Sequence, residues 1–339
     1  MENIKNIPKE KFELLGKQST ETREHIAAPS LTFLQDSWRR LKKNKAAVFS
    51  MCIILLLVLV SIVTIWVTPY NPTKQTEFVN LPPKLPGVNI NGLNGKMLVG
   101  GNLVDKYQQL DVPKGTSFLL GTDYLGRDLL SRLFVGMRIS LIIGFCAAIL
   151  DITIGVIYGL TSGLLGGRVD TIMQRILEIL SGIPNLVVMI LFITVFKPGI
   201  LTIVGAMALT NWISMARIVR AQTLKFKDQE FVMAATTLGE SRWKIALKHI
   251  LPNISSVIVV QMMFSIPTAI FFEAFLSLIG LGITPPNASL GTLINDGIKN
   301  FRFLPYQMWS PALILSIIMI GFNLLADGLR DAFDPKTKE

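Results

Sequence analysis

The sequence has little charge, few histidines and almost no cysteine. Only 17% of its 339 residues are charged, and it contains two cysteines and two histidines. Cys52 and Cys146 both lie inside long apolar stretches, and segment 69–136 has no cysteine, so we expect no disulfide framework. His25 and His249 are far apart and no H-E-x-x-H motif occurs, so we expect no metal site.

Motifs for nucleotide binding and catalysis are also missing. A phosphate-binding loop needs the pattern G-x-x-x-x-G-K-S/T. The nearest stretch, around Gly16-Lys17, has Lys11 at the first glycine position and Gln18 after its lysine. No G-x-S-x-G sequence, the mark of a serine hydrolase, is present. We therefore expect no enzymatic activity and no cofactor in this chain, so any energy source must be another chain.

What the sequence does have is a high apolar content. Hydrophobic residues make up 50% of the chain, and the mean hydropathy is +0.50, which is typical of proteins that cross a membrane several times. The net charge of +10 could suggest nucleic acid, but the basic residues flank apolar stretches, so membrane topology explains them and no nucleic-acid partner is expected. The first apolar run is too long for a cleaved signal peptide and should remain as an anchor.

Six apolar stretches predict an all-α integral membrane protein with six transmembrane helices, since a helix needs about 20 apolar residues to cross a bilayer. We place them at 46–68, 139–165, 171–196, 200–215, 254–278 and 306–330. Gly182 and Pro184 should kink the third span, and Arg175 and Glu178 are spaced to form an ion pair. Tyr306 and Trp309 should mark the outer interface at the start of the sixth.

The distribution of basic residues predicts that both termini are cytoplasmic. Residues 1–45 are then a cytoplasmic leader that ends in a basic amphipathic helix at the lipid head groups, with Leu31, Leu34, Trp38 and Leu41 on its apolar face. Residues 69–136 form an extracytoplasmic loop, 137–330 the membrane core with a cytoplasmic loop at 217–252, and 331–339 a cytoplasmic tail. Asn91-Gly92 and Asn94-Gly95 predict a small hairpin in the extracytoplasmic loop.

Several polar or small residues stand out within the spans. Gly155, Gly159, Gly163 and Gly167 recur every four residues and should line one ridge for close helix packing. Asp151 and Glu273 are acidic residues in apolar surroundings, which makes them candidate pathway residues as well as candidate structural ones.

The stretch 230–253 is a polar island between two apolar segments. Ala234 and Ala235 are small helix-forming residues that let another surface approach closely, and Gly239 can end their helix. Glu240 and Ser241 can start a second short helix, and Pro252 fits the first turn of the next span. We expect a helix–turn–helix across the membrane face with its small residues outward, in which His249 caps or packs the loop.

This stretch resembles the coupling loop of binding-protein-dependent ABC importers, in the pattern Ala234-Ala235, Gly239 and Leu251-Pro252, although Met233 stands at the usual Glu position. Gly121-Thr122-Asp123, Gly126-Arg127-Asp128 and Ser131-Arg132 are similar to a signature of the C component of the peptide permeases (oligopeptide, dipeptide and nickel). Independently of the resemblance, Asp123 is a candidate cap for the helix that follows. Residues 275–282, 285–286 and 289–291 also look like this subgroup, except that Leu290 replaces a common Trp.

The resemblance covers roughly residues 35–335 and implies a type I ABC importer arrangement with an extracytoplasmic insertion between helices 1 and 2. It implies these partners: a homologous permease subunit as a heterodimer, two ATPase subunits that hold ATP and Mg, an extracellular substrate-binding protein, the lipid bilayer of the bacterial cytoplasmic membrane, and a peptide substrate. The residues that it assigns to ATPase coupling are Met233, Ala234, Ala235, Thr236, Leu238, Gly239 and Arg242.

Other functions stay open at this point. Within the family the substrate could be a dipeptide, a nickel chelate or a glutathione-like molecule, and stretch 285–297 favours oligopeptides. The insertion could contact the binding protein or shield the mouth of the path. A secondary transporter would instead use Asp151 and Glu273 for ions or protons, and a receptor would bind a partner through segment 69–136.

Overall fold

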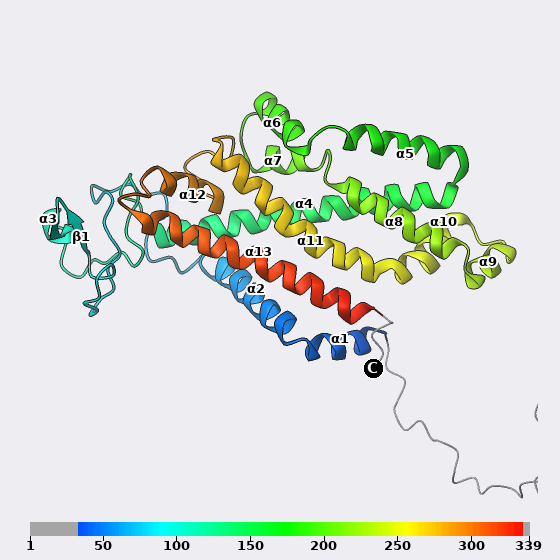
Figure 1. The fold of residues 1–339 in the computed structure, drawn as a ribbon, viewed down its shortest axis with the longest axis horizontal. Helices are drawn as coiled ribbons and strands as arrows, with labels where there is room; N and C mark the ends of the chain where they lie inside the picture. Colours follow the sequence, from blue (N-terminus) through cyan, green and yellow to red (C-terminus); the bar gives the residue numbers. More distant parts are fainter. Residues whose placement is uncertain (1–32, 335–339) are drawn as a thin grey trace, which may run out of the picture.

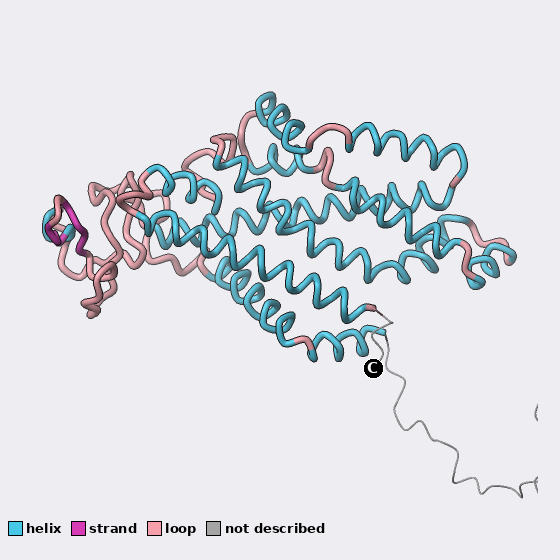
Figure 2. The backbone as a smooth tube through the Cα atoms, in the orientation of Figure 1, coloured by secondary structure: helices cyan, strands magenta, loops and turns pink. Residues whose placement is uncertain are grey.

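The computed structural model describes residues 33–334. Residues 1–32 of the expected leader, with Leu31 of its amphipathic helix, and residues 335–339 of the expected tail lie outside the described residues. Most of the described residues are helical, as expected, but segment 64–128 consists mainly of loops and holds one small two-stranded sheet (Figure 2). Its main helices are α1 (Phe33–Lys43), α2 (Lys45–Val63), α4 (Leu129–Leu165), α5 (Gly167–Ser181), α6 (Asn185–Phe196), α7 (Ile200–Met207), α8 (Trp212–Lys227), α9 (Glu230–Thr237), α11 (Leu251–Leu278), α12 (Leu290–Lys299) and α13 (Pro305–Phe333).

Five helical stretches are long and apolar enough to cross a membrane, and a sixth span results if the bent pair α5–α6 counts as one. The five are α2, α4, Ile200–Lys227, Arg242–Leu278 and α13. Counted in that way, the described residues agree with the expected six spans. The α5–α6 pair bends by 76° at the break that contains Gly182 and Pro184, so the expected kink is a full interruption of the helix.

Several boundaries differ from expectation: the helical stretch of the fourth span continues to Lys227 and not to 215, and the first span ends at Val63 and not at 68. The second span begins at Leu129 and not near 139, because Asp128 caps the helix ahead of the apolar run. With 37 residues, α4 is about 55 Å long, so it extends well beyond the roughly 30 Å hydrocarbon layer. The expected second short helix, α10 (Arg242–Ile245), is continuous with α11 through the π-helical turn Ala246–Ile250, so it forms the first turns of the fifth span.

The glycine ridge of α4 packs against α8. A methyl group added at Gly155, Gly159 or Gly163 would lie within 2.7 Å of atoms of α8. This confirms the packing role of three of the four expected glycines. Gly167 was wrongly included: it has a positive φ of 52°, lies past the end of α4 and has open space around it.

The segment between α2 and α4 folds into a small unit at one end of the molecule (Figure 1). It contains the antiparallel strands β1 (Lys96–Val99) and β2 (Asn102–Asp105) and the short helix α3 (Lys106–Gln109). The expected hairpin is present, but its turn is Gly100-Gly101 and not an Asn-Gly pair, since Val99 pairs with Asn102. Leu81, Tyr107 and Phe118 form its core.

Hydrogen bonds attach this insertion to the helices. The Tyr306 hydroxyl donates to the Leu81 carbonyl (3.0 Å), and the Gln307 amide donates to Asn80 Oδ1 (2.9 Å) and the Thr122 carbonyl (3.0 Å). The insertion is therefore bonded to the start of α13. At the opposite end of the molecule lie α9, α1 and the end of α13 (Figure 1).

Candidate functional site

Residues 230–250, from the start of α9 to the end of the π-helical turn, form a compact bend that we call the elbow. The elbow lies at the end of the molecule away from the insertion (Figure 1). The Gly239 amide donates to the Thr236 carbonyl and the Glu240 amide to the Ala235 carbonyl, the paired bonds that commonly close a helix on a left-handed residue. Gly239 supplies that residue with φ 81°, which confirms that it ends the helix. The Ser241 side chain then accepts from the Lys244 amide and starts α10, also as expected.

The two faces of the elbow differ in character. Val232, Ala235, Ile245, Ala246 and Ile250 are buried against α4 and α8. Large apolar side chains point the other way: Met233, Leu238, Trp243 and Leu247 are all exposed, and Leu238 is 85% exposed.

The prediction that Ala234 and Ala235 both face outward was half wrong. Ala234 is exposed, but Ala235 packs inward, because residues one apart on a helix face different directions. Thr236 and Arg242 are exposed as well. The outward surface is therefore apolar and built from larger side chains than the alanine pair suggests.

A charge cluster holds the elbow to the first turns of the fifth span. Glu240 accepts from Lys244 (3.1 Å) and His249 (2.8 Å), and Lys248 lies 3.7 Å away. Lys244, and then His249, hold the pKa of the Glu240 carboxyl below its usual range. The expectation that His249 packs this loop is confirmed. Sequence reasoning treated Glu240 only as a helix start, although its spacing of four from Lys244 was a usable signal.

The segment Gly121–Asp128 forms a buried network at the other end. Asp123 accepts from Arg127 Nε (2.8 Å), from Arg132, and from the amides of Leu125 and Arg127 (both 2.9 Å). Arg132 also lies 3.7 Å from Asp296 of α12. Asp123 was expected to cap the next helix, and this was wrong: the cap is Asp128, which accepts from the Ser131 amide (2.8 Å).

The glycines of this segment are sterically required. A methyl group on Gly121 would lie 2.2 Å from the Leu81 carbonyl oxygen, and one on Gly126 would lie 2.1 Å from that of Thr76. Both glycines also have positive φ angles. Thr122 is fully buried, and its hydroxyl donates to the Phe78 carbonyl (2.6 Å). The segment thus joins the insertion to α4 and α12.

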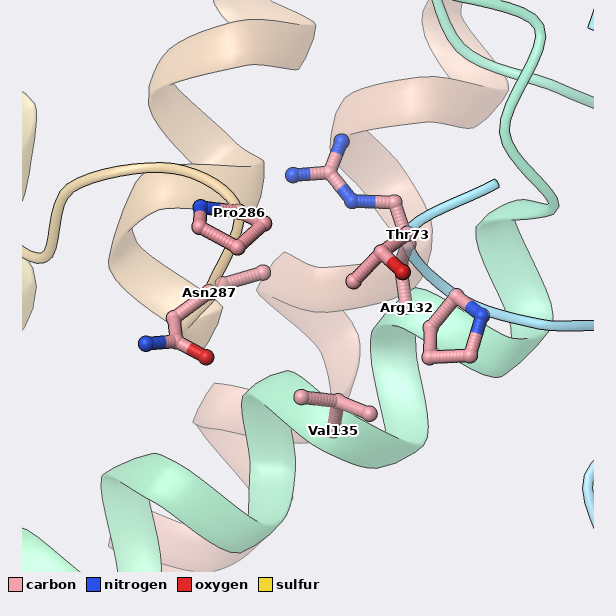
Figure 3. A pocket seen from close by; sticks show the side chains of 7 residues that line it. Thr73, Arg132, Val135, Pro286 and Asn287 are labelled. Atoms are coloured by element: carbon pink, nitrogen blue, oxygen red, sulfur yellow. The ribbon is translucent and has the colours of Figure 1, made fainter. Parts of the chain in front are cut away.

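A small pocket adjoins this network. It lies between the beginning of the insertion, the first turns of α4 and the loop that precedes α12, and Figure 3 shows its side chains. Its lining residues are Pro72, Thr73, Arg132, Val135, Pro286, Asn287 and Ala288. Arg132 was part of the signature found in the sequence, but its position beside a pocket was not predicted.

The two candidate acids of the spans are both buried but lie in different surroundings. Asp151 of α4 is 3% exposed, and its Oδ1 has no hydrogen-bond partner among the described residues. Glu273 of α11 is completely buried and accepts from the hydroxyls of Ser277 (2.8 Å) and Ser140 (3.0 Å). The Leu290 amide at the start of α12 donates to the same Ser140 hydroxyl (3.2 Å). Glu273 therefore joins α11, α4 and α12.

Known proteins identify the chain's family. The profile of the family "Binding-protein-dependent transport system inner membrane component" matches residues 152–339, and "N-terminal TM domain of oligopeptide transport permease C" matches residues 32–83. The chain belongs to this inner membrane family. The helical membrane fold is thus that of a permease of binding-protein-dependent ABC importers, as the motifs predicted.

Relatives match the chain along its whole length. The dipeptide transport system permease protein DppC of Lactococcus lactis subsp. cremoris (strain MG1363) is 47% identical over 99% of this chain and 100% of its own length. The oligopeptide transport system permease protein OppC of Bacillus subtilis (strain 168) is 40% identical over 99% of this chain and 100% of its own. The matches thus extend through the insertion.

A solved structure supports the fold alone. A chain of the MetNI methionine ABC transporter in an inward-facing conformation gives a TM-score of 0.51 at 16% identity, covering 60% of this chain and 97% of that one. The permease therefore has the type I importer arrangement of helices, with additional elements outside the matched part.

Proposed function

We propose that this permease is a membrane-spanning subunit of an ATP-driven importer of peptides. The observation that carries the proposal is the elbow at α9: a short helix with an exposed apolar face, placed between two spans and held to the fifth span by the Glu240 cluster. The names of the relatives support peptides as the substrate, since dipeptide and oligopeptide permeases both match the full chain. The proposal therefore covers both peptide lengths.

In this proposal two separate ATPase subunits hold ATP and Mg, and this chain needs no cofactor. Their closing motion moves the elbow as a rigid body, through Met233, Ala234, Thr236, Leu238 and Arg242, while Ala235 fixes α9 to the spans. The elbow end and both termini then face the cytoplasm, where ATP is.

At the opposite end an extracellular binding protein delivers the peptide, and a second, homologous permease subunit encloses the path. The insertion faces the binding protein there. The Asp123 network and Glu273 hold the mouth helices α4, α12 and α13 in place, so we assign both a positioning role.

The test replaces Gly239 by valine. Valine is strained at a φ of 81°, so the end of α9 must change its backbone path, although open space surrounds the new side chain. We expect the purified transporter to keep hydrolysing ATP while peptide uptake into vesicles falls. Gly87→Val is the matched control, because Gly87 has a similar φ of 77° and equally open surroundings but lies in the insertion. Normal coupled uptake by Gly239→Val would contradict the role of the elbow.

A further inference from the structure

Asp151 lies in the middle of a row of small side chains along α4. Ala147, Asp151, Gly155 and Gly159 follow one another at steps of four, so they share one ridge of the helix. An acidic side chain inside a membrane span needs a partner. Asp151 forms no ion pair with any described residue. Ser265 of α11 offers the carboxyl a hydrogen bond but no charge, and Oδ1 is left without a partner.

The neighbours of Asp151 on this ridge show which part of the chain faces it. One turn before it, Ala147 belongs to the same apolar cluster as Met207, the last residue of α7. One turn after it, a methyl group on Gly155 would lie 3.0 Å from the carbonyl oxygen of Trp212, the first residue of α8. Asp151 therefore faces the four residues that separate α7 from α8.

These four residues, 208–211, carry two more oxygen atoms that lack a partner. Thr210 is 4% exposed and Asn211 is half-buried. Thr210 Oγ1 and Asn211 Oδ1 are both buried atoms without a hydrogen-bond partner among the described residues. Six buried side-chain atoms of the described residues lack a partner, and the three that are oxygens all lie on these two facing segments. None of the three bonds to another, so a small bound group is needed to satisfy them together.

A second break in the helices lies beside the first. Helix α5 ends at Ser181, before the 76° bend, and Leu180 packs in one cluster with Trp212 and Ile213 at the start of α8. Two interrupted spans therefore meet near Asp151. Backbone carbonyl groups that leave a helix at such breaks are free to coordinate cations, as sodium-coupled transporters with discontinuous helices do.

We propose that Asp151, Thr210 and Asn211 bind a small monovalent cation, of the size and charge of sodium, between α4 and the break of α7–α8. Carboxylate, hydroxyl and amide oxygens are hard ligands, which suit alkali and alkaline-earth ions. One carboxylate balances one positive charge, and the described residues hold no cluster of three His, Cys, Asp or Glu side chains for a more highly charged metal ion. The expectation of no metal site considered histidine ligands, whereas this site consists of oxygen atoms alone.

Other occupants fit these three oxygen atoms less well. A peptide cannot reach Asp151, because the residue is 3% exposed. Water brings no charge, so the carboxylate would stay uncompensated within the membrane. A proton on Asp151 would allow one hydrogen bond, to Thr210 or to Asn211, and the other oxygen would stay without a partner. A bound cation satisfies all three oxygens and the charge at once.

Thermal unfolding tests the site without any transport measurement, so the inference stands or falls separately from the proposed function. The permease is purified at native expression with its bound chains and measured in sodium chloride and in N-methylglucamine chloride of equal ionic strength. A ligand that binds only the folded state raises the unfolding temperature once its concentration exceeds its Kd. We expect sodium to raise it by several degrees, and radiolabelled sodium to bind saturably to the same preparation.

Two substitutions change the site itself. Asp151→Asn should lose the sodium response, and without sodium it should unfold at no lower temperature than wild type, because an uncompensated buried charge is gone. Thr210→Val keeps the size of the side chain but removes one ligand, so the sodium concentration for half the effect should rise by about tenfold.

The matched control for Thr210→Val is Thr223→Val. Thr223 is a buried threonine of α8, and its hydroxyl donates to the Val219 carbonyl of its own helix (2.7 Å). This variant should keep the sodium response of the wild type. If Asp151→Asn cannot be purified, the comparison of the two threonine variants decides alone, and equal sodium responses from them would overturn the inference.

Three further results would overturn it. The first is an equal sodium response in wild type and Asp151→Asn, which would place the ion elsewhere. The second is a wild type that ignores sodium and differs from Asp151→Asn only through pH, which would make the bound group a proton. The third is a response to magnesium or calcium in place of sodium.

Discussion

At the residue scale, a few buried charged side chains stabilise the end of the molecule that carries the insertion. Asp123 places one carboxylate between two guanidinium groups, and all three residues are 2–3% exposed. A buried ion pair stabilises a fold only when its members are all present, since removing one leaves an uncompensated charge. The segment Gly121–Asp128 therefore stabilises the fold of the permease at the insertion end.

We predict that Asp123→Ala destabilises the purified permease by about 3–5 kcal/mol, because Arg127 and Arg132 are left buried without their shared partner. The measurement is thermal unfolding in detergent. Asp36→Ala removes the partly exposed Asp36–Arg40 pair and should cost at most about 1 kcal/mol. Equal decreases in unfolding temperature for the two variants would mean that the Asp123 network stabilises the fold no more than an exposed ion pair does.

Glu240 gives a pH-dependent prediction. Its pKa in the folded chain lies below the usual value because Lys244 and His249 donate to it. A lowered folded pKa means that the carboxylate stabilises the fold at neutral pH, and that this contribution disappears as the pH falls through that lowered value. The difference in unfolding temperature between wild type and Glu240→Gln should thus be largest at pH 7. It should shrink once the pH falls below about 4.5, the usual pKa of a glutamate, and vanish below the lowered pKa of the folded chain.

The control for this prediction is Glu77→Gln, since Glu77 is exposed in the insertion and far along the chain from the elbow. It should show little gap at any pH. A gap for Glu240→Gln that stays constant down to low pH would show that the charge of the cluster does not stabilise the elbow.

Residue identities predicted the caps of the elbow but not the partners of the buried charges. Gly239 and Ser241 act through their own backbone neighbours, so local rules suffice. Asp123 instead binds Arg132, one turn into α4, and Arg132 reaches Asp296 far along the chain. Such long-range pairs depend on how helices pack, which spacing alone does not encode.

At the scale of elements, the close contact between α4 and α8 depends on glycines of α4, which have no side chain. A methyl group on Gly159 would lie 2.6 Å from the Ala216 carbonyl oxygen and 2.9 Å from the Arg220 amide nitrogen. Because these atoms belong to the backbone, α8 would have to move away. The spacing of the glycines predicted this close packing, but not which helix is the partner.

We predict opposite effects for two glycine-to-alanine changes. Gly159→Ala should destabilise the permease by about 1–3 kcal/mol through overpacking. Gly205→Ala in α7 should be neutral or stabilise by up to about 1 kcal/mol, because its new methyl group would meet Phe192 at an ordinary 3.5 Å and alanine favours the helix. Thermal unfolding of both variants measures this, and stabilisation by Gly159→Ala would contradict the packing.

Helix ends were harder to predict than helices. The sequence located all six apolar stretches, since hydropathy depends on composition alone. It missed the early start of α4 and the continuity of α10 with α11, because both lie where polar residues begin. The Gly182–Pro184 break was visible in the residues, but its 76° angle depends on the packing of α5 against α4 and α8.

At the scale of the whole molecule, long helices join two ends of different structure. The insertion and the Asp123 network lie at one end and the elbow at the other, and α4 and α11 extend between them (Figure 1). The glycine ridge fixes α4 to α8, and the elbow packs against both. In the proposed function, a displacement of the elbow would therefore reach a helix, α4, that also contacts the insertion.

Purification at native expression tests the central claim most directly. The chain is extracted in mild detergent, bound chains are identified by mass, and the preparation is reconstituted for peptide uptake with and without ATP. The account predicts a second six-span permease and ATPase chains, with uptake that requires ATP and a binding protein. A chain that comes out alone, yet takes up peptide without ATP, would contradict it and turn attention to Asp151 and Glu273.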